Sequence, residues 1–294
     1  MPAIRTLQTF LAVARSGSFA AAGQQVGLTA AAVGQQMRAL EESVGRPLFD
    51  RSARAVALNA AGRAMVASAD DLVARWAALS QAEATSDQDL TGSVQVGALV
   101  SALMGAFADA LWSLKRRHPL LEVRLFAGLS ATFAQQVEAG ELDAAVVTQP
   151  PHRLPSGLTW TPLYAEPMVL VVPRKPHFTL PSQPLEMLRR APFLRFDRNT
   201  WTGLLVDRAL AQCGTAVRDE LELNSVEAII ALVRQGFGIS IVPQLRNVDW
   251  SRDRALRVVR LSRVSVQRHV GLLERRQHSR QRFTAAIREY FEGR

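Results

Sequence analysis

The chain has 294 residues, 48% of them hydrophobic, and a net charge of +9, which is enough for two or three folded domains and excludes a disordered tail protein. No apolar run has the length of a membrane span, and the polar residues in the N-terminal segment exclude a signal peptide. The single cysteine, Cys213, excludes an internal disulfide, so we expect a cytoplasmic protein.

The first fifty residues predict three short helices with apolar residues at helical spacing. Ser18 is a good N-cap for the second of them, over Phe19–Val26. Gly27 then permits a tight turn, and Thr29 caps a third helix that runs to about Ser43. Two short helices joined by a glycine-containing turn form a helix-turn-helix.

The two faces of the third predicted helix differ in the size of their side chains. Val33, Met37 and Leu40 form an apolar stripe that is expected to pack on the first two helices. The opposite face has short side chains beside Gln35 and Arg38, and small residues let a recognition helix approach the bases in the major groove. In this interpretation Gln35 pairs with adenine, Arg38 with guanine or phosphate, and the helix N-terminus with phosphate. The alternative is a three-helix bundle with an alanine-rich solvent face.

A basic turn and a long helix follow. Two short strands, Pro47–Phe49 and Val56–Leu58, are predicted around a basic tip, and such a wing suits phosphate or minor-groove contact. Asn59 caps a helix to about Glu83. Apolar residues alternate three and four apart along it, as in a coiled-coil seam: Leu58, Met65, Ala69, Leu72, Trp76 and Leu79. A dimer held by this helix would supply the second half-site. The residues expected to contact DNA are Ser18, Thr29, Ala30, Ala31, Gly34, Gln35, Arg38, Arg51 and Arg54.

The order of short motifs in residues 12–62 is specific: Gly17-Ser18-Phe19, the alanine-rich helix, Arg38-Ala39-Leu40-Glu41, Gly45, Pro47-Leu48-Phe49, Arg51 and Ala61-Gly62. This order resembles the DNA-binding segment of LysR-type transcriptional regulators. The sequence departs from the family at Thr29–Gln36, which reads TAAAVGQQ in place of a Ser-Gln-Pro/Ser-Ala-like start. The resemblance implies a winged helix-turn-helix in residues 1–58, a linker and dimerisation helix in residues 59–90, and an effector-binding domain in residues 91–294.

Strands and helices alternate over the rest of the chain, which predicts parallel sheets flanked by helices. Among the predicted elements are a helix over Ala102–Arg117 and a strand over Met168–Val172. This pattern resembles the two-lobed, periplasmic-binding-protein-like effector domain of the same family, so the predicted fold class is α/β with an N-terminal winged helix-turn-helix that is rich in helix. The resemblance implies crossings near Thr161–Ala165 and Val264–Arg268, with lobe 1 in residues 91–162 and 268–294 and lobe 2 in residues 163–267.

Two such lobes enclose a cleft at the carboxyl ends of their strands. Helices that start at serine or threonine would turn free N–H groups towards it, which favours an organic anion as the effector. The resemblance implies that Arg195 or Arg198 pairs with the anion and that Phe196 or Trp201 covers an apolar ring. The alternative is that the hydroxyls are helix caps and the two aromatic residues are ordinary core. The expected effector-binding residues are Val100, Ser101, Ser130, Thr148, Arg195, Phe196, Thr200 and Trp201.

The sequence shows no catalytic constellation. The five histidines lack metal-ligand spacing, and there is no P-loop or Gly-x-Ser-x-Gly motif, so we predict no enzyme, metal or cofactor. We expect a transcriptional regulator that binds double-stranded DNA as a homodimer or homotetramer, responds to a small-molecule effector and has no membrane partner. The alternative is a small-molecule sensor whose N-terminal helices only dimerise.

Overall fold

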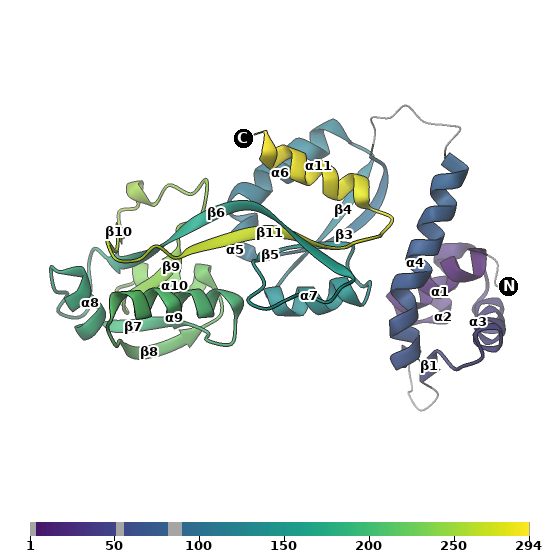
Figure 1. The fold of residues 1–294 in the computed structure, drawn as a ribbon, viewed down its shortest axis with the longest axis horizontal. Helices are drawn as coiled ribbons and strands as arrows, with labels where there is room; N and C mark the ends of the chain where they lie inside the picture. The colour runs from purple at the N-terminus through teal and green to yellow at the C-terminus, as the bar shows by residue number, and fades with distance from the viewer. Residues whose placement is uncertain (1–3, 51–55, 82–89, 294) are drawn as a thin grey trace.

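The computed structural model describes residues 4–50, 56–81 and 90–293, and it shows a helical head beside a two-lobed domain (Figure 1). The head contains α1 (Ile4–Ser16), α2 (Phe19–Val26), α3 (Ala30–Val44), the short strands β1 (Phe49–Asp50) and β2 (Ala57–Leu58), and the long helix α4 (Ala60–Gln81). The core of the head forms where α4 packs on α1, and it includes the apolar stripe of α3.

The turn between α2 and α3 is built as the sequence predicts. The hydroxyl of Ser18 accepts a hydrogen bond from the backbone N–H of Ala21, and Gly27 ends α2 with a φ of 73°. The chain then returns so closely that a Cβ on Gly23 would lie 2.4 Å from the carbonyl oxygen of Leu28. Only glycine allows this approach, so the predicted helix-turn-helix is confirmed.

The wing is smaller than predicted. Its strands β1 and β2 pair antiparallel over two residues each, Phe49 with Leu58 and Asp50 with Ala57. The expected DNA contacts Arg51 and Arg54 at its tip lie outside the described residues.

The two-lobed domain follows residue 90. Lobe 1 contains β3 (Gly92–Ala98), α5 (Val100–Leu103), α6 (Ala106–Arg117), β4 (Leu121–Ala127), α7 (Ser130–Glu138), β5 (Ala144–Thr148) and α11 (Gln281–Glu292). Lobe 2 contains α8 (Pro184–Arg190), β7 (Pro192–Phe196), α9 (Trp201–Cys213), β8 (Arg218–Leu223), α10 (Val226–Arg234), β9 (Ser240–Pro243), the 3-10 turn η1 (Trp250–Arg252) and β10 (Leu256–Val259). Two long strands, β6 (Leu158–Pro173) and β11 (Gln267–Arg275), run through both lobes (Figure 1).

The main sheet is mixed, so the prediction of a parallel sheet holds for β3, β4 and β5 and is wrong for the strand pairs made by β6 and β11. Its strand order is β10-β6-β11-β5-β3-β4, with β9 also on β6. Strand β3 is parallel to β4 and β5, but β11 is antiparallel to both β5 and β6 because it returns from lobe 2 to lobe 1. In lobe 2 the short pair β7-β8 is parallel.

Strand β6 is much longer than the predicted Met168–Val172 and passes unbroken through Thr161–Ala165. The short predicted strand leaves out this part of the chain, which contains Pro162, a residue that usually interrupts a strand. In the structure Pro162 lies opposite Gly271, where the register of β6 against β11 shifts. A proline is tolerated in a sheet at such a bulge, since it removes no regular ladder hydrogen bond there.

The predicted helix Ala102–Arg117 is two helices, α5 and α6, and this prediction is also wrong. The break lies at Gly105, whose φ of −114° and ψ of −140° are not helical. A Cβ on Gly105 would lie 2.7 Å from the carbonyl oxygen of Arg246, which belongs to a loop of lobe 2. A contact from so far along the chain has no local sequence signal.

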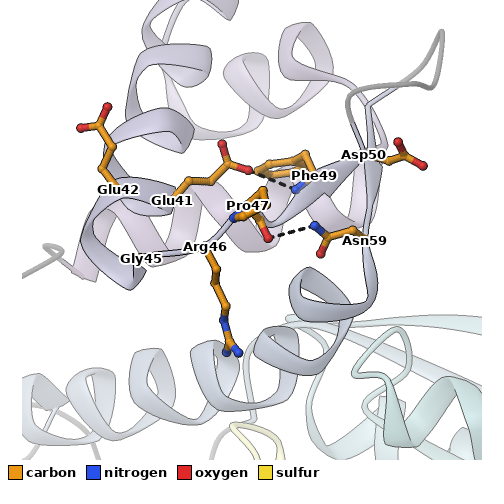
Figure 2. A pocket seen from close by; sticks show the side chains of 8 residues that line it. All are labelled: Glu41, Glu42, Gly45, Arg46, Pro47, Phe49, Asp50 and Asn59. Atoms are coloured by element: carbon orange, nitrogen blue, oxygen red, sulfur yellow. Dashed lines mark hydrogen bonds between the residues drawn. The ribbon is translucent and has the colours of Figure 1, made fainter.

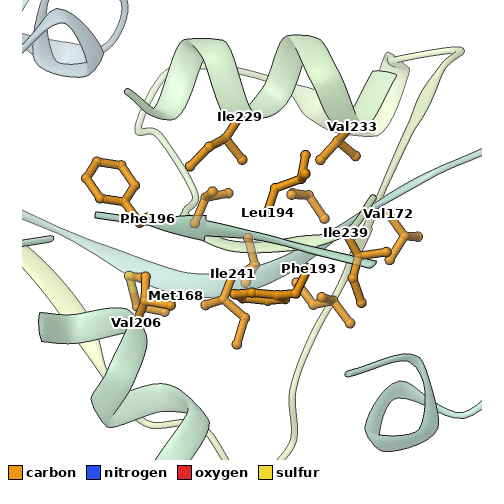
Figure 3. Close-up of a cluster of buried hydrophobic side chains, with 14 of the residues drawn as sticks. Met168, Val172, Phe193, Leu194, Phe196, Val206, Ile229, Val233, Ile239 and Ile241 are labelled. Carbon is orange, nitrogen blue, oxygen red and sulfur yellow. The ribbon is translucent and has the colours of Figure 1, made fainter. Parts of the chain in front are cut away.

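The core of lobe 2 fixes where α9 and α10 begin. Figure 3 shows Ile229 and Val233 of α10 on one side of the strands and Val206 of α9 on the other. The side chain of Leu194 on β7 points towards α10. All of these side chains are buried. This packing holds the N-termini of both helices at the edge of lobe 2 where β7 ends.

The head also contacts lobe 1 within the same chain. The buried carboxylate of Asp70 on α4 lies 3.4 Å from the guanidinium of Arg15 on α1 and 3.4 Å from that of Arg275 at the end of β11. Arg275 also donates to the carbonyl oxygen of Val137 in the last turn of α7 and to that of Leu142, just after this helix. Asp70 is therefore shared by both parts of the molecule.

Candidate DNA-binding face and effector pocket

The outer face of α3 is exposed along its length. Thr29, Ala30, Ala31, Gln35 and Arg38 are all exposed, while Val33, Met37 and Leu40 on the opposite face are buried. The hydroxyl of Thr29 accepts from the backbone N–H of Ala32 and so caps the helix. The structure thus brings the predicted residues of α3 together on one solvent-facing surface.

Gly34 lies in the middle of this face, and the packing of the head does not require it to be glycine. Its φ is not in the left-handed region, and an added Cβ would meet only the ring of Phe19, at an ordinary 3.8 Å. Glycine costs about 1 kcal/mol relative to alanine in a helix interior. The head therefore carries this cost without a packing benefit of its own.

The wing is fixed to the end of α3 by two polar side chains. Figure 2 shows Glu41 accepting from the backbone N–H of Phe49 at 3.1 Å and Asn59 donating to the carbonyl of Pro47 at 2.9 Å. Glu41 also accepts from the N–H of Leu48 at 2.7 Å. The adjoining hollow, about 760 Å³, is lined by these residues and opens widely to solvent. Because the carboxylate of Glu41 already accepts hydrogen bonds from the backbone, we interpret the hollow as the place where the wing is attached to α3 and not as a ligand site.

The predicted coiled-coil seam of α4 is buried in one part of the helix and exposed in another. Ala69 is buried inside the head, whereas Leu72 and Trp76 are 52% and 54% exposed further along the helix. Large apolar side chains exposed four residues apart lie on one helix face. This part of α4 therefore presents an apolar surface outside the core of the head.

A cavity of about 290 Å³ lies between the lobes. Its lining includes six of the eight residues expected to bind the effector, from both lobes: Val100, Ser101, Ser130, Phe196, Thr200 and Trp201. Lobe 1 contributes the residues that follow β3 and β4, and lobe 2 those that follow β7 and β8. The carboxyl ends of these strands thus form the pocket.

The other two expected residues, Thr148 and Arg195, do not line the cavity. The Oγ1 atom of Thr148 lies 3.2 Å from that of Thr202, and both side chains are buried. The guanidinium of Arg195 pairs with Asp207 and Asp219, each at 2.6 Å. The assignment of Arg195 to an effector anion is therefore corrected, because acidic side chains from α9 and β8 already neutralise its charge.

Arg198, the alternative anion partner, is also paired outside the pocket. Its guanidinium binds Glu222 at 3.0 Å and shares Asp219 with Arg195. These groups form a charge network that joins β7, α9 and β8, so neither arginine supplies an unpaired cation to the cleft.

Asp219 should make the stability of lobe 2 pH-dependent. Burial alone would raise the pKa of its carboxyl, but hydrogen bonds from Arg195 and Arg198 outweigh burial and hold the pKa below its usual value. A pKa that is lowered by folding means stabilisation that is present at neutral pH and is lost as the pH falls through the folded pKa, below about 4. We expect Asp219→Asn to be less stable than wild type at neutral pH, with a smaller difference in acid, by urea denaturation. An equal difference at both pH values would contradict this.

Sequence analysis did not find Arg268, the one arginine that lines the pocket among the described residues. Arg268 and Glu166 face each other on β11 and β6, and each side chain is only 1% exposed. The Nε atom of Arg268 lies 2.8 Å from Glu166, and Nη1 donates to the hydroxyl of Ser101 at 3.0 Å. The sequence did contain a signal for this pair: Glu166 and Arg268 carry opposite charges, and each stands just before an apolar stretch in one of the two predicted crossings between the lobes.

No helix in the described parts of the chain is long and apolar enough to cross a membrane. No group of three or more histidine, cysteine, aspartate or glutamate side chains in the same parts could hold a metal ion.

Comparisons with known proteins agree with this architecture. Residues 4–63 match the family described as "Bacterial regulatory helix-turn-helix protein, lysR family", and residues 87–294 match "LysR substrate binding domain". The chain is 30% identical to the HTH-type transcriptional regulator IlvR of Caulobacter vibrioides over 243 residues, covering 82% of each chain. It is also 30% identical to the HTH-type transcriptional regulator CbbR of Xanthobacter flavus over 277 residues, covering 90% of this chain and 80% of that relative.

The fold is similar to that of a solved full-length protein. A variant of OxyR from Pseudomonas aeruginosa superimposes with a TM-score of 0.80 over 99% of this chain and 94% of that one, at 19% sequence identity. The two family matches together cover residues 4–63 and 87–294, which include most of the head and both lobes. The chain belongs to the LysR family of transcriptional regulators.

Proposed function

We propose that this chain binds double-stranded DNA in the cytoplasm as a homodimer or homotetramer and regulates transcription in response to a small-molecule effector held between its lobes, without catalysis. The observation that carries the proposal is the exposed face of α3, where small residues flank Gln35 and Arg38. The face has no packing role in the chain. The alternative, in which the N-terminal helices only dimerise, leaves it without a function.

The DNA contacts follow from the chemistry of that face. The amide of Gln35 matches an adenine edge, and the guanidinium of Arg38 matches guanine or a phosphate. The N-terminal turn of α3 at Thr29 favours a phosphate because its first N–H groups have no intrahelical partner. The anchor at Glu41 holds the wing at a fixed angle to α3.

A second copy of the chain would complete the DNA site. One winged head contacts few base pairs, so a dimer is needed to read two half-sites. The exposed Leu72 and Trp76 on α4 offer an apolar surface for this pairing.

The effector would act by preferring one arrangement of the lobes. The cavity is lined from both lobes, so a ligand in it contacts both at once. A ligand shifts an equilibrium only as far as its affinity differs between the two states. Because Asp70 joins α4 to lobe 1, a change of lobe arrangement reaches the head through a direct contact.

The test is an electrophoretic shift with DNA from beside the protein's own gene, at increasing salt. Wild type should bind this DNA in preference to a shuffled sequence, with affinity that falls as salt rises. Arg38→Ala should cost about 1–3 kcal/mol per half-site, and Gln35→Ala should reduce selectivity. Gln135→Ala, a matched change at an exposed position on α7, should bind like wild type. Absence of sequence-selective binding by wild type would overturn the proposal.

A further inference from the structure

The pocket between the lobes has only two charged side chains in its described lining, Arg268 and Glu227. The charge of Arg268 is already compensated. Its guanidinium bonds to Glu166 through Nε and Nη2 and to the hydroxyl of Ser101 through Nη1, and it is almost completely buried. A carboxylate that entered the pocket would have to compete with Glu166 for it. Arg268 therefore gives the pocket no unpaired positive charge.

Glu227 is different, because no cationic side chain of the described residues pairs with it. It lies in the first turn of α10, on the lobe 2 wall, and no ion pair to it is found among the described residues. Its Oε2 atom accepts from the hydroxyl of Ser225 at 2.7 Å, but its Oε1 atom is buried without a hydrogen-bond partner. A buried carboxylate oxygen without a donor is costly, even near the positive end of a helix dipole. Among the described residues, the carboxylate of Glu227 on the lobe 2 wall therefore has no counter-ion and lacks one hydrogen-bond donor, which favours a cationic group beside it.

The lobe 1 wall has the opposite character. Helix α7 begins there, and its first residues Ser130, Ala131 and Thr132 line the pocket. The N-cap residue Leu129 makes no side-chain hydrogen bond to the helix, whereas α9 and α10 are capped by Thr200 and Ser225. The first N–H groups of a helix have no intrahelical partner, so those of α7 face the cavity uncapped. Such a helix end favours an anion.

We propose that the effector is a compact aminocarboxylate, bound with its carboxylate on the N-terminal turn of α7 and its protonated amine beside Glu227. The two walls belong to different lobes, so a molecule with both charges would bridge the cleft. The cavity of about 290 Å³ is near the lower end of the ~300–1,000 Å³ range of small-molecule pockets, which favours a ligand of this size. This inference rests on the proposed function of the pocket as the effector site.

The proposal also predicts what binds poorly. A simple monocarboxylate satisfies α7 but brings a second negative charge near Glu227. A simple amine satisfies Glu227 but leaves the helix end unpaired. Each should bind more weakly than the molecule that carries both groups.

The experiment compares matched ligands on the full chain. The probes are the twenty standard amino acids, β-alanine and γ-aminobutyrate, screened by thermal shift, because a bound ligand raises the melting temperature. Each responder is then compared by calorimetry with its des-amino acid and its decarboxylated amine, for example leucine with 4-methylpentanoate and 3-methylbutylamine. We expect at least one aminocarboxylate to bind at least about tenfold more tightly than either analogue, as the loss of a charge-assisted hydrogen bond implies.

A variant tests the role of Glu227 directly. Glu227→Gln keeps the shape of the side chain and removes its charge, so affinity for the responder should fall about 10- to 100-fold while affinity for the des-amino acid stays the same or rises. Glu138→Gln, the same change at the exposed far end of α7, should leave both affinities unchanged. Melting curves of both variants without ligand show whether they are folded.

Three outcomes would overturn the inference: no response to any aminocarboxylate, a des-amino acid that binds as tightly as its parent, or unchanged binding by Glu227→Gln. All three leave the proposed regulatory function standing, since selective DNA binding is measured separately without ligand. Conversely, failure to bind DNA would overturn the proposed function while leaving the ligand measurements intact.

Discussion

Glu166→Gln is expected to lower the free energy of unfolding by about 3–5 kcal/mol, the usual cost of removing one partner from a buried ion pair. The change leaves the guanidinium of Arg268 charged, buried and uncompensated where β6 and β11 cross between the lobes. It also weakens the acceptor for the backbone N–H of Arg246, which Glu166 binds at 2.9 Å. Urea denaturation followed by circular dichroism would measure the loss.

A double-mutant cycle separates the charge from the packing. Arg268→Met removes the cation and keeps most of the volume, so the double variant Glu166→Gln/Arg268→Met should recover much of the stability that Glu166→Gln loses. If Glu166→Gln costs less than about 1 kcal/mol, or if the two changes simply add, the pair does not act as described.

Gly23→Ala is expected to destabilise the head by about 3 kcal/mol or more, at the upper end of the cost of overpacking. Its Cβ would lie 2.4 Å from the carbonyl oxygen of Leu28, and this backbone atom cannot move without opening the turn between α2 and α3. Thermal melts of the full chain should show an early transition for the head and a loss of DNA binding with it.

Gly34→Ala is the matched control, and it should have the opposite effect on stability. Its Cβ meets nothing closer than 3.8 Å, so the helix gains about 1 kcal/mol of propensity. DNA affinity should nevertheless fall, because the new methyl group stands on the face proposed to enter the groove. A variant that is both more stable and binds DNA as tightly as wild type would contradict the assignment of this face.

The parts of the fold that could be predicted are those with local signals. Helix caps at Ser18 and Thr29, the turn at Gly27 and the stripe of Val33 and Met37 are all set by residues within a few positions of one another. The cleft-lining loops were found by resemblance to a family, because the family places the same loops at the same strand ends.

The parts that could not be predicted depend on contacts between distant segments. Arg195 looked like an anion-binding residue because the sequence does not show that Asp219 lies beside it in the next strand. The pair of Arg268 and Glu166 joins residues 102 positions apart. The break at Gly105 is set by a loop of the other lobe. In each case the neighbour that decides the structure is far away in the sequence, so the residues nearby do not indicate it.

Strand β11 has Arg268 near its first residue and Arg275 at its last. The first lines the ligand cavity, and the second holds Asp70 of α4. An extended strand that is hydrogen-bonded on both sides can slide or tilt as a unit but can scarcely stretch. A displacement of Arg268 at the cavity must therefore either move Arg275 as well or break its ion pair with Asp70. The length of β11 thus sets the distance between the ligand cavity and the contact with the head that moves with it.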